Sequence, residues 1–119
     1  MLESVLNDLR SSPRYAPHIT GWRRLPARPP RYASWPEALD PRVTAAAAVR
    51  GFARPYTHQA QAIEAVLRGE HVVVVTPTAS GKTLCYNLPA LHVLLNQPAS
   101  RALYLFPTKA LAHDQLAEL

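Results

Sequence analysis

Residues 71–83 read His71-Val-Val-Val-Val-Thr-Pro-Thr-Ala-Ser-Gly-Lys-Thr83. A continuous run of valines is typical of a strand that is buried on both faces of a parallel sheet. The small residues that follow allow successive backbone N–H groups to point into one concavity. A helical pattern begins where this turn ends, and the N-terminus of a helix attracts phosphate oxygens. The stretch therefore predicts a strand, a phosphate-binding loop and a helix.

The turn matches the nucleotide-binding pattern G-x-x-x-x-G-K-[ST] except at its first position, where Thr76 replaces glycine. In that pattern the lysine, here Lys82, reaches the β- and γ-phosphates, and the hydroxyl of Thr83 joins the Mg²⁺ shell. We therefore expect a nucleoside triphosphate to bind at Thr76, Pro77, Thr78, Ala79, Ser80, Gly81, Lys82 and Thr83. The alternative is a strand, a turn and a helix that spell Gly-Lys-Thr by chance.

A second strand is expected over Arg101–Phe106, about thirty residues after the first, which fits a parallel βαβ unit with a right-handed crossover. Because parallel strands end on the same side of a sheet, the phosphate loop and the turn Pro107–Lys109 are expected to share one face. Periodicity and capping residues predict the helices. They are Leu2–Arg10, Pro41–Arg50, a helix capped by Thr57 and stopped by Arg68-Gly69, Lys82–Leu95 with a kink or a division at Pro89, and Lys109–Leu119 capped by Thr108.

The chain has 119 residues and a formal net charge of +5, and nine of its thirteen basic residues lie between Arg10 and Arg54. Residues 11–36 carry six prolines, five arginines and no acid, which predicts an extended arm. Its aromatic and arginine residues suit stacking on nucleic-acid bases. They equally suit an arm whose rings pack on the domain, and we favour packing for Trp22 and Trp35.

Cys85 is the only cysteine, so no disulfide is possible and a reducing, cytoplasmic location is expected. We interpret Cys85 as a small buried residue rather than a reactive thiol. The five histidines lack metal-ligand spacing, and no apolar run is long enough to cross a membrane.

Gln59 lies one turn into the helix that precedes the phosphate loop. Its amide has both a donor and an acceptor for the N6 and N7 atoms of adenine. The alternative interpretation is an ordinary exposed glutamine on a helix surface.

Three segments resemble motifs of the DEAD/DEAH-type superfamily-two helicases in their usual order. Gly51-Phe-x-x-Pro55-x-x-x-Gln59 resembles the Q motif, Thr76–Thr83 resembles motif I, and Pro107-Thr-Lys-Ala-Leu-Ala112 resembles motif Ia. From about His18 to the end, the chain resembles the MrfA/YprA-like DNA helicases.

The resemblance implies that ATP and Mg²⁺ are cofactors, that Gln59 reads adenine, and that Lys82 and Thr83 are catalytic, with Thr83 touching Mg²⁺. It implies that Pro107, Thr108 and Lys109 contact a DNA backbone, with RNA also possible. We then expect residues 1–36 to be a helix and basic arm, and residues 37–119 to be the first part of a RecA-like helicase domain. The Asp-Glu motif and further domains are expected beyond Leu119, so this chain alone should not hydrolyse ATP.

The implied function is the N-terminal segment of an ATP-dependent DNA helicase, acting in genome maintenance such as DNA repair. One alternative is part of a P-loop kinase or metabolic ATPase that has no nucleic-acid partner. Another is a binding fragment without catalysis, whose two-stranded sheet would have bare edges.

Overall fold

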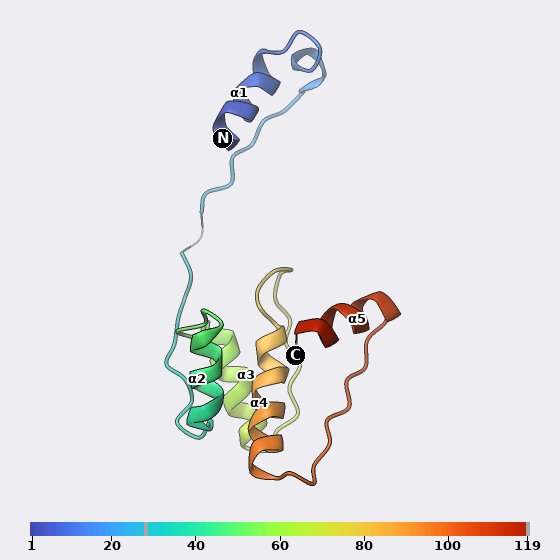
Figure 1. Ribbon diagram of the computed structural model, residues 1–119. Coiled ribbons are helices and arrows are strands. Elements are labelled where there is room, and N and C mark those ends of the chain that lie inside the picture. Colours follow the sequence, from blue (N-terminus) through green and yellow to red (C-terminus); the bar gives the residue numbers. More distant parts are fainter. Residues whose placement is uncertain (28, 119) are drawn as a thin grey trace.

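The computed structural model describes residues 1–27 and 29–118. Arg28, in the predicted arm, and Leu119, the last residue of the predicted C-terminal helix, lie outside the described residues. Figure 1 shows a helical body from which the N-terminal arm extends, and the molecule measures 64 × 33 × 27 Å. The helices, in chain order, are α1 (Leu2–Ser11), the short 3-10 helix η1 (Ala16–His18), α2 (Pro41–Val49), α3 (Thr57–Leu67), α4 (Thr83–Asn96) and α5 (Lys109–Glu118).

The predicted helices are all present, and most of their ends agree with the sequence to within one residue. At the start of α3 the N-cap is Tyr56 rather than Thr57, because the Thr57 hydroxyl donates a hydrogen bond to the Arg31 carbonyl (3.0 Å). The helix α4 runs without interruption through Pro89, so the expected division into two segments is wrong. Pro89 is buried against the helical body, and this packing offsets the single hydrogen bond that proline removes.

The core lies where α2, α3 and α4 meet, side by side in Figure 1. Its centre is Ile63 of α3, which is fully buried, and it contacts one buried residue from each neighbouring helix, Val43 of α2 and Leu88 of α4. Trp35 packs against this cluster, and its indole N–H donates to the Ala53 carbonyl (3.2 Å), which confirms the expected packing of this ring. The core therefore fixes α3 against α4, the two helices that flank the predicted phosphate loop.

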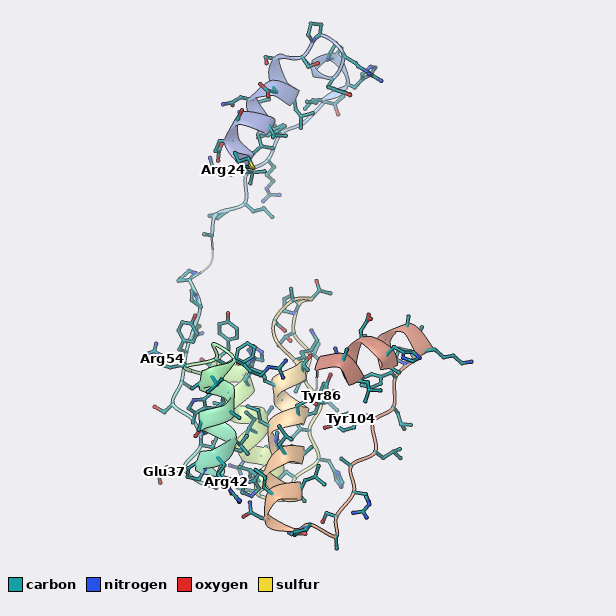
Figure 2. The ribbon with its side chains drawn as sticks, viewed as in Figure 1. Arg24, Glu37, Arg42, Arg54, Tyr86 and Tyr104 are labelled. Atoms are coloured by element: carbon teal, nitrogen blue, oxygen red, sulfur yellow. The ribbon has the colours of Figure 1, made fainter. Side chains whose placement is uncertain are left out.

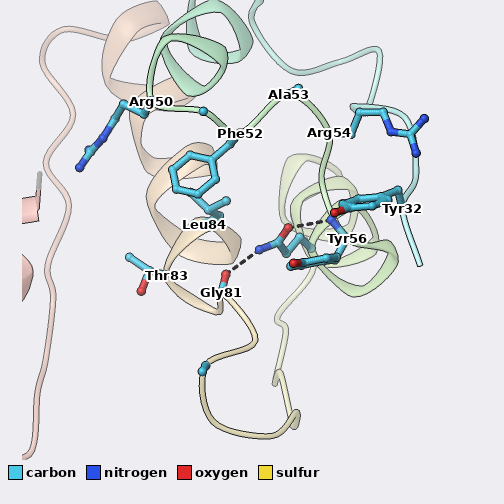
Figure 3. Close-up of a pocket in the computed structure, with 12 residues that line it drawn as sticks. Tyr32, Arg50, Phe52, Ala53, Arg54, Tyr56, Gly81, Thr83 and Leu84 are labelled. Carbon is cyan, nitrogen blue, oxygen red and sulfur yellow. Dashed lines mark hydrogen bonds between the residues drawn. The ribbon is translucent and has the colours of Figure 1, made fainter. Parts of the chain in front are cut away.

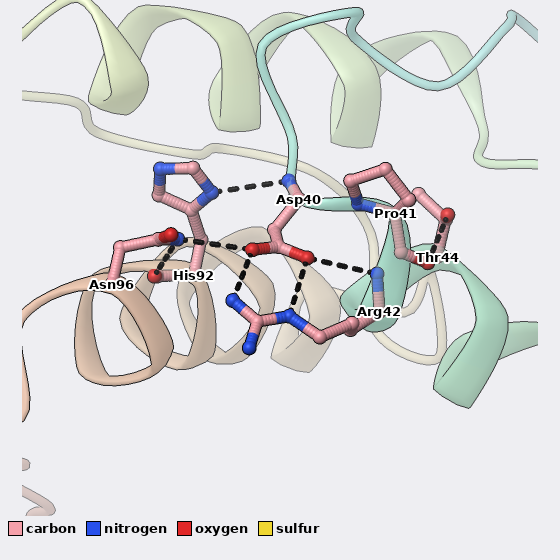
Figure 4. Close-up of polar contacts among 6 residues, drawn as sticks. All are labelled: Asp40, Pro41, Arg42, Thr44, His92 and Asn96. Atoms are coloured by element: carbon pink, nitrogen blue, oxygen red, sulfur yellow. Dashed lines mark hydrogen bonds and ion pairs between the residues drawn. The ribbon is translucent and has the colours of Figure 1, made fainter.

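The start of α2 is fastened to the end of α4 through Asp40 (Figure 4). The carboxylate of Asp40 caps α2 by accepting the backbone N–H of Arg42 (2.9 Å) and also binds the Arg42 guanidinium. From α4, the Asn96 amide donates to the same carboxylate (3.1 Å), and His92 Nδ1 accepts the Asp40 N–H (3.1 Å). Asp40 thus has the capping role that the Asp-Pro pair predicts.

The prediction of two strands is wrong for this structure, because no strand forms among residues 1–27 and 29–118. The segments 71–76 and 101–106 are extended, but neither has a partner for a hydrogen-bond ladder. They flank a cleft of about 800 Å³ beside α4, and residues such as Val73 and Leu103 are 90% and 85% exposed. A strand is defined by pairing, so an apolar pattern alone does not produce one.

The arm leaves the body before α2 and ends in a unit made of α1, η1 and the residues that follow them (Figures 1 and 2). The Arg10 guanidinium lies 4.1 Å from the centre of the Trp22 ring, and Arg24 pairs with Glu3 at 2.9 Å. Trp22 is 42% exposed and does not reach the body, so the expected packing of Trp22 on the domain is wrong. The arm carries this ring away from the core, and an arginine covers it instead.

Two further expectations concern membranes and the thiol. Of the helices that the structure describes, none is both long and apolar enough to cross a membrane. Cys85 is buried in α4, and this burial raises the pKa of its thiol, which suppresses the reactive thiolate. The expectation of a small buried residue is confirmed.

Removing the centre of the core should destabilise the chain strongly. We expect Ile63→Ala to lower the free energy of unfolding by about 2–4 kcal/mol, because the substitution leaves a cavity between three helices. Val66→Ala on the same helix is the control, since Val66 is 36% exposed, and its effect should be within about 0.5–1 kcal/mol. Denaturant titration followed by circular dichroism measures both, and equal losses would contradict the assigned core.

The Asp40 cap should make stability depend on pH. The hydrogen bonds from Arg42 hold the pKa of the Asp40 carboxyl well below its usual range. Such a group stabilises the fold above its ordinary pKa of about 3.9, and this contribution is lost as the pH falls further. We expect the wild-type melting temperature to drop below about pH 4, and Asp40→Asn, which keeps the cap oxygen without its charge, to reduce that dependence.

Circular dichroism melts near neutral pH and well below pH 4 test this expectation. Glu37→Gln makes the same change of charge on an exposed side chain nearby and should leave the pH dependence as in the wild type. An Asp40→Asn profile that overlays the wild-type profile would refute the role of this carboxylate.

Candidate functional site

The site is built around the side chain of Gln59, which is only 3% exposed. Its Oε1 accepts the backbone N–H of Tyr56 (2.8 Å), and its Nε2 donates to the Gly81 carbonyl (2.8 Å), as Figure 3 shows. The amide therefore ties the first turn of α3 to the loop before α4. This buried bridge excludes the alternative of an ordinary exposed glutamine.

The loop before α4 is held together by the ammonium group of Lys82. Its Nζ donates to the carbonyls of Pro77 (2.8 Å) and Thr76 (3.0 Å), and the hydroxyl oxygens of Thr76 and Ser80 lie 3.4 Å away. The two hydroxyls are also 2.6 Å from each other. A triphosphate would have to replace these loop oxygens as the partners of Lys82.

The backbone of the loop explains which positions need glycine. Positive φ angles occur at Ala79 (58°) and Gly81 (72°), whereas Thr76 has none. A threonine is therefore acceptable at position 76, and its hydroxyl contributes a contact that glycine lacks. At Gly81 a Cβ atom would lie 2.5 Å from Gln59 Nε2, so glycine is required both by the backbone angle and by this close approach.

A pocket of about 670 Å³ opens beside the bridge, within the size range of small-molecule sites. Phe52 and Leu84 lie along one side, and Tyr32 and Tyr56 along the other (Figure 3). Gln59, Gly81 and Thr83 also line it. The structure thus brings Gln59 and part of the predicted phosphate loop into one cavity, as expected if they bind a single ligand.

Aromatic residues continue from this pocket toward the phosphate loop. The rings of Tyr32 and Tyr56 stack with their centroids 5.2 Å apart, and Tyr56 stacks in turn on His58 at 5.8 Å. His58 Nε2 lies 3.0 Å from the Ser80 carbonyl. The sequence alone does not place Tyr32 in the site. The only available signal was the alternation of aromatic and arginine residues in the arm, which does not show where the arm lies.

The residues predicted to contact nucleic acid are Pro107, Thr108 and Lys109. All three are exposed, and they lie at the N-terminal end of α5. Thr108 caps this helix as expected, because its hydroxyl accepts the Leu111 N–H (3.3 Å). The turn lies at the same end of the body as the loop before α4 (Figure 1). The cleft of about 800 Å³ supports this arrangement, since Lys82 and Thr83 line it together with Phe106 and Leu111, which flank the turn.

The first turn of α4 also touches α5 and the extended segment before it. The Tyr86 hydroxyl donates to Gln115 Oε1 (2.7 Å), and the Tyr86 ring meets the Tyr104 ring edge-on at 5.8 Å (Figure 2). Partial burial raises the pKa of the Tyr104 phenol. No group of three or more acidic, histidine or cysteine side chains that could hold a metal occurs in the described part of the chain.

Comparison with known proteins assigns a class to this arrangement. The family model for DEAD/DEAH box helicases matches residues 56–119, and the chain therefore belongs to this helicase family. It is 46% identical over all of its 119 residues to the ATP-dependent helicase YprA of Bacillus subtilis, and 39% identical over 114 residues to the ATP-dependent helicase HRQ1 of Saccharomyces cerevisiae. The chain spans 16% and 10% of the lengths of these two relatives.

A solved structure is similar as well. The crystal structure of the helicase MrfA bound to DNA and AMPPNP matches 98% of this chain with a TM-score of 0.82 and 45% sequence identity. The match covers 16% of the MrfA chain. The fold is therefore that of a RecA-like helicase domain, although the paired strands of such a domain are absent from the described residues.

A comparison of two glycines tests the bridge between Gln59 and the loop. Gly69 has a positive φ like Gly81, but a Cβ there would meet nothing within 4 Å. Gly69→Ala should therefore show only the backbone strain, about 1–2 kcal/mol. Gly81→Ala adds a clash with Gln59, so it should cost more and should alone shift the NMR signals of the Gln59 side-chain amide. Equal costs with an unshifted amide would contradict the bridge.

Proposed function

We propose that this chain is the ATP- and nucleic-acid-binding N-terminal segment of an ATP-dependent DNA helicase. The observation that carries the proposal is the bridge from Gln59 to Gly81, which joins the pocket of about 670 Å³ to a loop carrying Gly-Lys-Thr at the start of α4. Membership of the helicase family and the likeness to MrfA bound to DNA and AMPPNP support it. For the whole protein, we propose that the activity is ATP-driven unwinding of DNA.

The hydrogen bonds of Gln59 support adenine as the base. One N–H of its amide and one lone pair of its oxygen are engaged by Gly81 and Tyr56. One donor and one acceptor remain, because a glutamine amide has two of each. Adenine offers the complementary pair at N7 and N6, whereas guanine offers two acceptors at this edge.

In the proposed site the loop residues 76–83 surround the triphosphate. Backbone N–H groups at the start of α4 and the Lys82 ammonium would bind the phosphate oxygens. The Thr83 hydroxyl would contact Mg²⁺, which supplies charge neutralisation on the β- and γ-phosphates. Hydrolysis would need the Asp-Glu motif and a second RecA-like domain, so we propose that this chain binds ATP without turning it over.

The exposed turn Pro107–Lys109 is the proposed contact with the DNA backbone. Thr108 caps the start of α5, and the free N–H groups at a helix N-terminus can bind a phosphate. Such contacts do not distinguish sequences and weaken with salt. Because they also suit RNA, our choice of DNA rests on the similar helicase MrfA, which is solved with DNA bound. A role in DNA repair is part of the same proposal.

The two extended segments are the proposed first strands of a parallel sheet. Val72 and Val74 line the cleft beside α4, while Val73 and Val75 are 90% and 89% exposed on the other side. Apolar side chains on both faces are typical of a central parallel strand. We further propose that residues 1–36 form an arm, that residues 37–119 belong to the helicase domain, and that the protein works in a reducing compartment such as the cytoplasm.

Two lysine variants of the full helicase test this function. Lys82→Ala should lower ATP hydrolysis roughly 100-fold or more and abolish unwinding, because the charge that meets the transferred phosphate is gone. Lys109→Ala removes an equal charge at the DNA turn. It should preserve hydrolysis without DNA and reduce the slope of log DNA affinity against log salt by roughly 0.7 to 1.

Steady-state hydrolysis assays with and without DNA, and fluorescence binding at several salt concentrations, give these values. Normal unwinding by Lys82→Ala would refute the assignment. The alternative of a kinase or metabolic ATPase would be supported instead if neither DNA nor RNA stimulated hydrolysis by the wild type.

A further inference from the structure

The positive charge of the chain is concentrated in residues 1–36. This segment has six arginines and two acidic residues, whereas residues 37–119 have seven basic and six acidic residues. The segment therefore carries four of the five net positive charges, and the rest of the chain is almost neutral. Such an imbalance is typical of a surface that meets a polyanion. None of the three helicase-like motifs lies in this segment.

The structure leaves the arginines at the end of this segment on the surface. We call residues 1–27, which contain α1 and η1, the N-terminal unit. Its basic side chains are all exposed, and they are Arg10, Arg14, Arg23 and Arg24. The ion pair between Arg24 and Glu3 is exposed as well, with 82% and 65% of the two side chains accessible. An exposed ion pair contributes little energy, so Arg24 can exchange the carboxylate for a phosphate.

Exposed aromatic rings lie beside these arginines. The Arg14 guanidinium is 5.4 Å from the centre of the Tyr15 ring, and the Arg10 guanidinium is 4.1 Å from the centre of the Trp22 ring. Tyr15 is 45% exposed and Trp22 is 42% exposed. Since Trp22 does not pack on the body, the structure favours the other use of such rings, which is stacking on nucleic-acid bases.

The composition of the unit favours nucleic acid over other polyanions. Its four basic side chains are all arginine. A guanidinium is planar, so it binds phosphate oxygens with two hydrogen bonds and also stacks on flat rings. Aromatic rings between arginines suit unstacked bases, because every base has a π-face. A single strand presents phosphates and flat rings in alternation, whereas an acidic protein surface or a lipid headgroup does not.

The position of the unit suits a strand that also contacts the body. In Figure 1 the chain leaves the body at the end that carries the loop before α4 and the start of α5, and the unit lies beyond this end. Prolines at positions 26, 29 and 30 restrict the connecting stretch to extended backbone. Two linked contacts with one strand bind more tightly than either contact alone, because the second is intramolecular.

We propose that the N-terminal unit is a second binding site for single-stranded DNA. Its arginines contact phosphates, and Tyr15 and Trp22 stack on bases. This inference rests on the DNA-binding function proposed above, and it adds a site that is separate from the turn Pro107–Lys109. The unit then contributes to DNA affinity in two ways, of which the phosphate contacts weaken with salt and the stacking contacts do not.

Fluorescence anisotropy tests the proposal on the full helicase, with a labelled single strand of mixed sequence at several salt concentrations. Arg14→Ala combined with Arg23→Ala removes two charges from the unit. It should reduce the slope of log affinity against log salt by about 1.4, because each phosphate contact on a single strand contributes about 0.7. Tyr15→Ala removes no charge, so it should weaken binding roughly fivefold or more and keep the wild-type slope.

Arg68→Ala combined with Arg101→Ala is the matched control, because it removes two charges from the body. Arg68 is the C-cap of α3, and Arg101 follows α4. Both helices begin at the loop before α4 or are bonded to it, so these arginines lie toward the opposite end of the body. The control should keep the wild-type affinity and slope.

A wild-type slope in the variant of Arg14 and Arg23 would overturn the proposal and would indicate that the unit meets a protein instead. Wild-type affinity in Tyr15→Ala would also overturn it, because the rings would then not contact bases. So would an equal loss of slope in the control, since net charge alone would explain the effect. A wild-type helicase that binds no DNA would instead refute the proposed function.

Discussion

The hydrogen bonds of one buried amide connect the two halves of the site. Gln59 accepts from the backbone of Tyr56 and donates to the backbone of Gly81, each at 2.8 Å. A buried amide that lost either partner would leave an unsatisfied polar group, which costs about 1–3 kcal/mol. The first turn of α3, the proposed phosphate loop and the start of α4 therefore keep one arrangement. The arm joins it through the bridge between Tyr32 and Tyr56.

The rest of the fold holds this amide in place. The cluster of Leu39, Val43, Ile63 and Leu88 packs α4 against both α3 and α2. Gln59 lies on α3 and Lys82 is the N-cap of α4, so these two residues do not move independently. The bonds from Asp40 to His92 and Asn96 fix the far end of α4. The opposite flank of α4 is a wide cleft between exposed, extended apolar segments. The flank of α4 that faces α2 and α3 is therefore well packed, whereas the flank that faces the proposed strands is open.

The sequence was sufficient to predict features that depend on local chemistry. The Asp-Pro pair at the start of α2, the Thr108 cap of α5 and the Gly-Lys-Thr turn each have a direct physical cause, and the helices follow from them and from apolar spacing. The strands at residues 71–76 and 101–106 did not form, because strand formation requires a partner that periodicity cannot supply. The burial of Gln59 and the position of Tyr32 depend on contacts with residues 22 and 24 positions away in the chain. Such distant pairing leaves no pattern in the sequence.

The most direct test of the account is to record NMR spectra of the nitrogen-labelled chain during titration with Mg-ATP. If the loop and the amide form one nucleotide site, the backbone signals of Gly81, Lys82 and Thr83 and the side-chain amide of Gln59 will shift together and saturate at the same ATP concentration. Shifts confined to other parts of the chain, or a Gln59 amide that does not respond while the loop does, would contradict the central claim that the two are parts of one site.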